Sequence, residues 1–187
     1  MRPERSRSKE IGADLRGADH VFSVVGFKNN ISDLITIYTD PVTFDSTTVN
    51  LDNAEIKGFE LSYSGQLAGW RLQAKATFQD PHNQADGRML RRRANQFGSF
   101  SVKRRFGNWS VGAEATASGY RYDSSLETTA SRMHGYALLN LAAAYSISKD
   151  WSINGRWNNV SDRQYELVQF YKTQSVSQKG FVSRKEG

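Results

Sequence analysis

The chain has 187 residues, a hydrophobic fraction of 38%, a net charge of +6 and a pI near 9.6. It lacks the roughly 18–20 consecutive apolar residues of a membrane-spanning helix, which excludes a helical membrane protein but not a β-barrel. It has no cysteine, which excludes disulfides and thiolate metal sites. The basic balance suits anionic lipid or nucleic acid, but the cations follow no nucleic-acid-binding motif, so no nucleic-acid partner is expected.

The clearest pattern lies between residues 69 and 120, where apolar and polar residues alternate. From Trp70 to Gln79, every even position is apolar and every odd position is polar or charged. Neighbouring side chains of a strand point to opposite faces, so this pattern predicts a strand with one apolar and one polar face. In chain order, similar alternation predicts strands over residues 8–15, 20–37, 54–65, 70 to the loop at 82, 93–106, 109–122, 136–147 and 151–160.

Short turns and long loops alternate between these strands. The turns lie near residues 17, 67, 107 and 149, and the polar loops lie at residues 40–52, near 85, near 127 and beyond 161. Short turns at one end of antiparallel strands and long loops at the other are typical of an outer-membrane barrel, whose turns are periplasmic and whose loops are extracellular. The predicted fold class is therefore all-β, an antiparallel transmembrane β-barrel segment. A soluble sandwich is disfavoured because its strands are shorter.

Trp70, Trp109 and Trp151 each follow a short turn. In a barrel they would form the aromatic girdle at the membrane boundary, whereas a soluble protein would pack them in its core. The barrel interpretation predicts that lipid contacts the side chains of Trp70, Leu72, Ala74, Ala76 and Phe78. It predicts that the opposite side chains face the lumen of the barrel, namely those of Arg71, Gln73, Lys75, Thr77 and Gln79. Because unpaired backbone groups do not persist in hydrocarbon, the sheet must close, either alone with eight strands or as an arc of a larger barrel.

Four short strings resemble those of TonB-dependent outer-membrane receptors and occur in the same order. They lie at residues 2–6 with Pro3-Glu4, at residues 26–35 with Gly26-Phe27-Lys28-Asn29-Asn30, at residues 56–60 with Gly58-Phe59-Glu60, and at residues 158–166 with Asn158-Asn159-Val160-Ser161-Asp162. Among subfamilies, residues 90–94 and 165–168 look most like the cobalamin (vitamin B12) receptor. Residues 1–166 thus resemble the C-terminal part of such a barrel. Residues 167–187 are interpreted as an aberrant tail in place of the usual last strand, since they end without an aromatic residue.

The resemblance implies a barrel of about 22 strands, of which this chain would supply about eight or nine. It implies an outer-membrane receptor that binds cobalamin or an iron chelate, such as a siderophore, and imports it with energy from TonB. The implied partners are that small-molecule ligand, outer-membrane lipid and lipopolysaccharide, and TonB through a plug that this chain lacks. Residues 1–10 have no apolar run behind them, so we expect no secretory signal in the chain and an outer-membrane location only if it is exported.

The predicted ligand contacts lie in or beside the long loops: Arg91, Arg92, Tyr120, Tyr122, Asp123, Tyr165 and Tyr171. Guanidinium groups match phosphate and other anions with two parallel hydrogen bonds, and tyrosines combine contact area with a hydrogen-bonding group. Two other interpretations are open. The arginines could line a solvated rim or pair with Glu60 and Glu114 in the lumen, and the tyrosines could form an outer aromatic girdle.

Several alternatives to a receptor fragment remain at this point. One is a self-contained eight-stranded barrel with a structural or lipid-modifying role, in which Ser125 or Ser131 would act with His134. Another is a truncated remnant without function. Asp40, Asp45 and Asp52 could gather calcium in a loop, but they lack a regular carboxylate spacing. We predict no enzyme activity, no catalytic or metal site and no cofactor.

Overall fold

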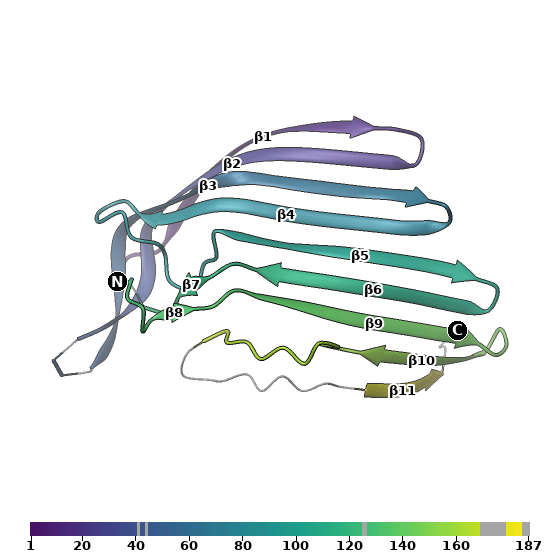
Figure 1. Ribbon diagram of the computed structural model, residues 1–187. Coiled ribbons are helices and arrows are strands. Elements are labelled where there is room, and N and C mark those ends of the chain that lie inside the picture. The colour runs from purple at the N-terminus through teal and green to yellow at the C-terminus, as the bar shows by residue number, and fades with distance from the viewer. Residues whose placement is uncertain (41, 44, 125–126, 169–178, 185–187) are drawn as a thin grey trace.

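The computed structural model describes residues 1–40, 42–43, 45–124, 127–168 and 179–184. One antiparallel sheet contains nine strands in the order β1-β2-β3-β4-β5-β6-β9-β10-β11, and β7 and β8 form a separate ribbon (Figure 1). The strands are β1 (Arg5–Arg16), β2 (His20–Thr39), β3 (Ser46–Leu67), β4 (Trp70–Asn83), β5 (Gln96–Phe106), β6 (Trp109–Ser118), β7 (Arg121–Tyr122), β8 (Arg132–Met133), β9 (Tyr136–Ser146), β10 (Trp151–Trp157) and β11 (Lys179–Arg184). In this part of the chain, no apolar helix reaches membrane-crossing length.

All the short connections lie at one end of the sheet and the long ones at the other, as Figure 1 shows. The turn between β3 and β4 consists of Ala68 and Gly69, whose φ angles are 49° and 79°. Positive φ at both central residues is the type I′ geometry, whose twist matches that of paired strands. Gly107 also has a positive φ, 54°, in the turn between β5 and β6. The predicted alternation of short turns and long loops is confirmed, apart from the length of one loop.

The prediction of a loop over residues 40–52 is wrong for most of that segment. β3 begins at Ser46, and its first residues pair with the end of β2, as in Val49 with Thr36 and Ser46 with Thr39. The connection is thus only residues 40–45. The cause is the β-branched content of residues 47–49, which fits a strand even where the sequence is polar. The two strands form a long hairpin that continues past the other strands.

Several further strand boundaries differ from the prediction. β1 begins at Arg5 and β5 begins at Gln96, where the predicted strands begin at residues 8 and 93. The predicted strand over residues 109–122 ends at Ser118, and Arg121–Tyr122 pairs instead with Arg132–Met133 inside the following loop. Gly119 N still donates to Gln96 O beside β5, and the chain leaves the sheet after this bond. The predicted strand over residues 151–160 ends at Trp157. Beyond residue 167, β11 pairs with β10; the interpretation of residues 167–187 as a replacement for the usual last strand stays a prediction.

One face of the sheet, here called the apolar face, is apolar from β1 to β10 between the short turns and the level of Phe78. Directly paired residues share a face, so the register assigns to it Ile11, Ala13, Leu15, Phe22, Val24, Phe59, Leu61, Tyr63, Trp70, Leu72, Ala74, Ala76, Phe78, Phe100, Val102, Val111, Ala113, Ala115, Leu139, Leu141, Ala143 and Ile153. From Trp70 to Phe78 this stretch measures about 26 Å along the strand. The apolar band of an outer-membrane barrel is about 25 Å tall. The prediction that Trp70, Leu72, Ala74, Ala76 and Phe78 lie on one face of β4 is confirmed.

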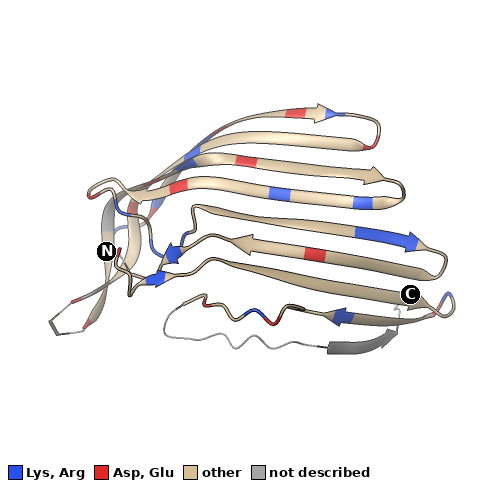
Figure 2. Cartoon of the chain, viewed as in Figure 1, with Lys and Arg blue, Asp and Glu red and all other residues tan. Residues whose placement is uncertain are grey.

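Beyond Phe78, the same face becomes charged. Lys28 Nζ lies 2.7 Å from a carboxylate oxygen of Glu55, and Lys57 Nζ lies 3.4 Å from the other. Lys57 also lies 3.8 Å from Asp80. Figure 2 shows charged residues along the middle of several strands as well as near their ends, and the register places those at mid-strand, such as Lys75 and Glu114, on the opposite face. The apolar face therefore has a sharp boundary on the long-loop side.

The opposite face, here called the polar face, carries the buried cluster at the long-loop end. Ile31, Ala54 and Ile56 are buried there with Leu90, and Phe27 and Leu34 pack against them. Leu90 belongs to the loop of residues 84–95, and its N–H donates to Pro81 O across 2.9 Å. That loop therefore folds back over the polar face and closes part of this end of the sheet.

Candidate ligand-binding site

Arg91 joins two connections at the long-loop end of the sheet. Its Nε donates to the carbonyl of Asp123 across 2.8 Å, and one terminal nitrogen donates to the carbonyl of Ile37 across 2.7 Å. The first acceptor lies in the loop of residues 119–135 and the second near the end of β2. A guanidinium group presents several N–H donors in one plane, so it can hold two such segments at once. Arg91 therefore acts as a link between loops.

Arg92 and Asp123 form an ion pair beside this link. Arg92 Nε lies 2.5 Å from Asp123 Oδ1, and the Arg92 backbone N–H donates to Tyr122 O across 2.7 Å. The Asp123 side chain is 4% exposed, whereas that of Arg92 is 44% exposed. Three of the predicted contact residues thus lie together: Arg91, Arg92 and Asp123. The carboxylate of Glu114, the alternative partner, lies 3.4 Å from Arg156 on the polar face, and the guanidinium of Arg92 pairs with Asp123.

Two of the predicted tyrosines lie together in the same loop. The ring centroids of Tyr120 and Tyr122 are 5.9 Å apart, and the rings meet edge to face. The guanidinium carbon of Arg132 lies 4.4 Å from the centroid of Tyr120, a cation–π contact. Tyr120 is 36% exposed, so its ring remains accessible beside these partners.

Tyr165 lies in a second group that includes the start of β9. Its ring is 4.6 Å from that of Tyr136, and the guanidinium carbon of Arg121 lies 5.4 Å from the Tyr136 centroid. Arg121 also donates to the carbonyl of Glu166 across 2.6 Å. Because Arg121 and Tyr122 are adjacent in β7, this ribbon connects the two groups of tyrosines. Tyr171 lies outside the described residues and remains a prediction.

A cavity of about 260 Å³ opens between the end of β2 and the loop of residues 84–95. Apolar residues and cations line it together, among them Ile37, Tyr38, Met89, Leu90, Arg88, Arg91 and Arg93. Ligand pockets usually span about 300–1,000 Å³, so this cavity suits one part of a larger ligand. Tyr38 lies beyond the predicted end of the strand over residues 20–37, and it joins this lining because β2 continues to Thr39 and pairs there with β3.

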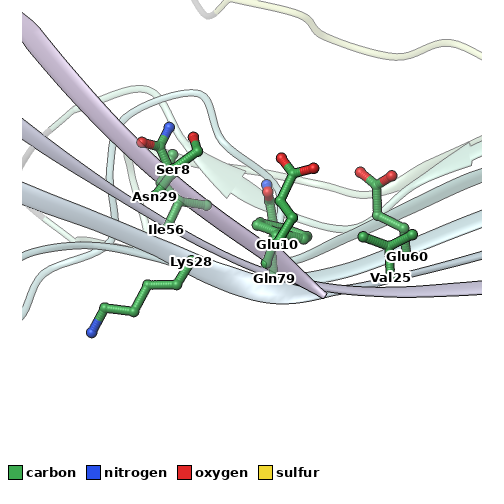
Figure 3. A pocket seen from close by; sticks show the side chains of 9 residues that line it. Ser8, Glu10, Val25, Lys28, Asn29, Ile56, Glu60 and Gln79 are labelled. Carbon is green, nitrogen blue, oxygen red and sulfur yellow. The ribbon is translucent and has the colours of Figure 1, made fainter. Parts of the chain in front are cut away.

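A second cavity of about 260 Å³ lies on the polar face of β1 to β4. Figure 3 shows Ser8, Glu10, Asn29 and Glu60 on one side of the sheet and Lys28 on the other. This is the alternation that the register requires, since Lys28 and Asn29 are consecutive in β2. The cavity is an open, polar hollow in the wall, suited to water and polar solutes.

The calcium hypothesis gains no support from the described residues, which contain no group of three or more His, Cys, Asp or Glu suited to a metal ion. Asp40 instead accepts backbone hydrogen bonds from Val42 across 2.7 Å and Thr43 across 3.0 Å. These two N–H donors, that of Thr43 above all, hold the pKa of the Asp40 carboxyl below its usual value. The carboxylate thereby closes the turn between β2 and β3.

The lipid-modifying alternative requires Ser125 or Ser131 to lie beside His134. Ser131 is buried, and its hydroxyl takes part in hydrogen bonds with Thr128 at 3.1–3.2 Å. His134 is exposed. Ser125 lies outside the described residues. The hydroxyl of Ser131 therefore serves its own turn, and the lipid-modifying alternative gains no observation in its favour.

Comparison with known proteins adds evidence of a different kind. The family model described as TonB dependent receptor-like, beta-barrel matches residues 1–160. The vitamin B12 transporter BtuB of Vibrio vulnificus is 26% identical over 168 residues, which cover 90% of this chain and 27% of that protein.

Two solved structures are similar in fold. The siderophore receptor PirA from Acinetobacter baumannii matches with a TM-score of 0.74 at 17% identity, over 97% of this chain and 31% of its own. The ferric yersiniabactin uptake receptor FyuA from Yersinia pestis matches with a TM-score of 0.72 at 18% identity, over 95% of this chain and 28% of its own. At these identities the likeness concerns the fold alone. The chain spans less than a third of the length of each of these three proteins.

Proposed function

Because the chain belongs to the family of TonB-dependent receptor β-barrels, we propose that it forms barrel wall and extracellular ligand-contacting loops of an outer-membrane receptor for cobalamin or a similar scarce ligand. The apolar face contacts lipid, and the polar face lines the lumen. The long loops face outward from the cell and meet the ligand first. Uptake is a property of the whole receptor, and this chain contributes wall and recognition surface to it.

The observation that carries the proposal is the convergence of the long loops on one group of residues. Arg92 keeps an accessible guanidinium above a buried carboxylate, and Tyr120 keeps an accessible ring. Aromatic area with a few fixed polar groups is the usual composition of a small-molecule site. Arg91 and Asp123 position these groups, since their own polar atoms are taken up by hydrogen bonds between loops. Tyr122 packs against Tyr120, and Tyr165 packs against Tyr136 in the neighbouring group.

Cobalamin is the first ligand to test because the relatives from Vibrio vulnificus and Photobacterium profundum are named vitamin B12 transporters. Iron chelates are the second, because PirA and FyuA are named for siderophores. Both ligand classes are larger than the cavity of about 260 Å³ beside Arg91. We therefore expect part of the ligand to enter this cavity and the remainder to lie over Tyr120 and Arg92.

The test is a calorimetric titration of the protein, purified from membranes in detergent, with cyanocobalamin and separately with a ferric catecholate chelate. Tyr120→Ala should weaken binding of the preferred ligand about tenfold, equal to about 1.4 kcal/mol. Tyr145→Ala is the matched control, because Tyr145 packs on Trp109 at the opposite end of the sheet and should leave affinity unchanged.

The outcomes separate the parts of the proposal. Binding of the chelate without cobalamin would correct the ligand and leave the site in place. Equal affinities for Tyr120→Ala and Tyr145→Ala would remove Tyr120 from the contact surface. Absence of binding by either ligand would contradict the assignment of cobalamin-like or chelate ligands to these loops.

A further inference from the structure

Arg104 interrupts the apolar face. In β1 to β10, it is the one Lys, Arg, Asp or Glu on that face between the short turns and the level of Phe78. The register fixes its orientation, because Arg104 pairs with Trp70 on one side and with Val111 on the other. Its neighbours in sequence, Lys103 and Arg105, lie on the polar face by the same register. Figure 2 shows the three cations as one continuous blue segment at the end of β5.

The guanidinium of Arg104 lies against the short turn between β3 and β4. Its central carbon is 5.5 Å from the ring centroid of Trp70. Its Nε is 3.7 Å from the position that a side-chain carbon on Gly69 would occupy. The side chain therefore extends from β5 across the start of β4, at the level of the aromatic girdle. An arginine on a lipid-facing surface is costly at the membrane midplane and inexpensive at the boundary, where its head can reach the polar layer.

Nothing in the described part of the chain neutralises Arg104. The ion pairs found there involve other cations, and the contact with Trp70 leaves the N–H donors of the guanidinium available for an anion. Around it the surface is apolar, with Leu72 and Val102 next on the same face. A cation with free donors, held against an aromatic ring at the edge of an apolar surface, is thus presented to the membrane boundary.

We propose that Arg104 and Trp70 bind the phosphate of a phospholipid head group in the periplasmic leaflet. A guanidinium group forms two parallel hydrogen bonds with a phosphate, which a lysine does not. The indole ring fits the head-group layer, where tryptophan is favoured. The acyl chains then lie along Leu72 and Val102. A free phosphate ion would satisfy the guanidinium but leave these apolar side chains uncovered, so the lipid is the occupant that fits the whole surface.

The experiment measures lipid retained by the protein purified in dodecyl maltoside micelles that contain phosphatidylglycerol. Native mass spectrometry counts bound lipid as the phosphatidylglycerol fraction is raised. Arg104→Gln should reduce retained lipid at least fivefold. Arg105→Gln removes the same charge at the adjacent residue, which lies on the polar face. This variant should therefore retain as much lipid as the unsubstituted protein. Inorganic phosphate in large excess over the lipid should displace little of it.

Equal retention by Arg104→Gln and Arg105→Gln would overturn the proposal. Complete displacement of lipid by inorganic phosphate would assign the site to free phosphate instead. Should Arg104→Gln fail to fold, as judged by its heat-dependent mobility on gels, Arg104→Lys and Trp70→Phe take its place. We expect reduced retention for both, since the first loses the two-pronged geometry and the second shrinks the ring. Full retention by both would also overturn the proposal.

Discussion

The guanidinium of Arg92 and the carboxylate of Asp123 lie 2.5 Å apart, although 31 residues separate them in the chain. The carboxylate is almost fully buried, so the guanidinium is its principal charge partner. Removing Arg92 leaves that carboxylate without compensation, which is the costly half of a broken ion pair. We therefore expect the pair to hold the loop that carries Tyr120 and Tyr122 in place.

Arg92→Ala should destabilise the loop of residues 119–135 by about 1–3 kcal/mol. This figure is smaller than the cost of breaking a fully buried ion pair, because the guanidinium of Arg92 is partly exposed to solvent. The measurement is amide hydrogen exchange at Asp123, whose N–H donates to Ser131 O across 2.8 Å. Arg156→Ala is the control, since its pair with Glu114 is half-exposed on both sides and should change stability by less than about 1 kcal/mol. Equal protection of Asp123 in both variants would show that the pair does not hold the loop.

Leu90→Ala should release the loop of residues 84–95 from the sheet. Leu90 is 5% exposed and packs with Ile31, Ala54 and Ile56. Truncation of a buried leucine costs about 2–5 kcal/mol. Limited proteolysis should then cut this loop at least tenfold faster. Leu167→Ala, at a residue 42% exposed, should leave the cleavage rate unchanged. A Leu90→Ala variant as resistant as the parent would contradict the packing described here.

Gly58→Ala should destabilise the hairpin of β3 and β4. A side-chain carbon at Gly58 would lie 2.1 Å from Phe78 O and 2.8 Å from the Cα of Gln79, so backbone must move. Such overpacking typically costs about 1–3 kcal/mol. Gly155→Ala serves as the control, because nothing lies within 4 Å of a side-chain carbon there. Thermal unfolding in detergent should separate the two variants, and identical midpoints would refute the predicted clash.

The turn between β2 and β3 should loosen in acid. The N–H groups of Thr43 and Val42 hold the pKa of the Asp40 carboxyl below its usual value. A carboxyl whose folded-state pKa is lowered stabilises the fold above its unfolded-state pKa, and that stabilisation is lost as the pH falls through the folded-state value. The protection of the Val42 and Thr43 amides, taken relative to the intrinsic exchange rate of each amide at the same pH, should therefore fall as the pH drops through the folded-state pKa of Asp40. Asp40→Asn should remove this dependence, and a parent protein with no acid response would contradict the hydrogen-bonding role.

The fold could be predicted from the sequence because barrel strands are long and two-sided. Trp70 to Gln79 alternates without a break, and each tryptophan of the predicted girdle follows a short turn on the apolar face. The hairpin over residues 46–52 was missed because the segment is mostly polar, and apolar and polar residues alternate only over residues 49–52. Strand pairing there depends on β2 as a partner, which so short a pattern does not reveal.

The loop cluster was predicted by residue type and not by contact. Arg91, Arg92 and Asp123 were chosen as polar groups in loops, whereas the link from Arg91 to Ile37 spans 54 residues and follows no spacing. Arg104 was also missed as a separate feature. It stood within a run of three cations, and only the register separates its side chain from those of Lys103 and Arg105.

The strict alternation of faces makes the strands sensitive to the parity of insertions and deletions. Loss of one residue between Trp70 and Phe78 would turn the side chains on one side of the deletion to the opposite face, so that Arg71 or Lys75 would come to lie on the apolar face. Loss of two would keep each remaining side chain on its own face. In the long loops, insertions and deletions of odd and even length should be tolerated equally, because no alternation of faces has to be kept there. Length variation among natural variants should therefore accumulate in the long loops, and where it occurs within the spanning strands it should come in even numbers.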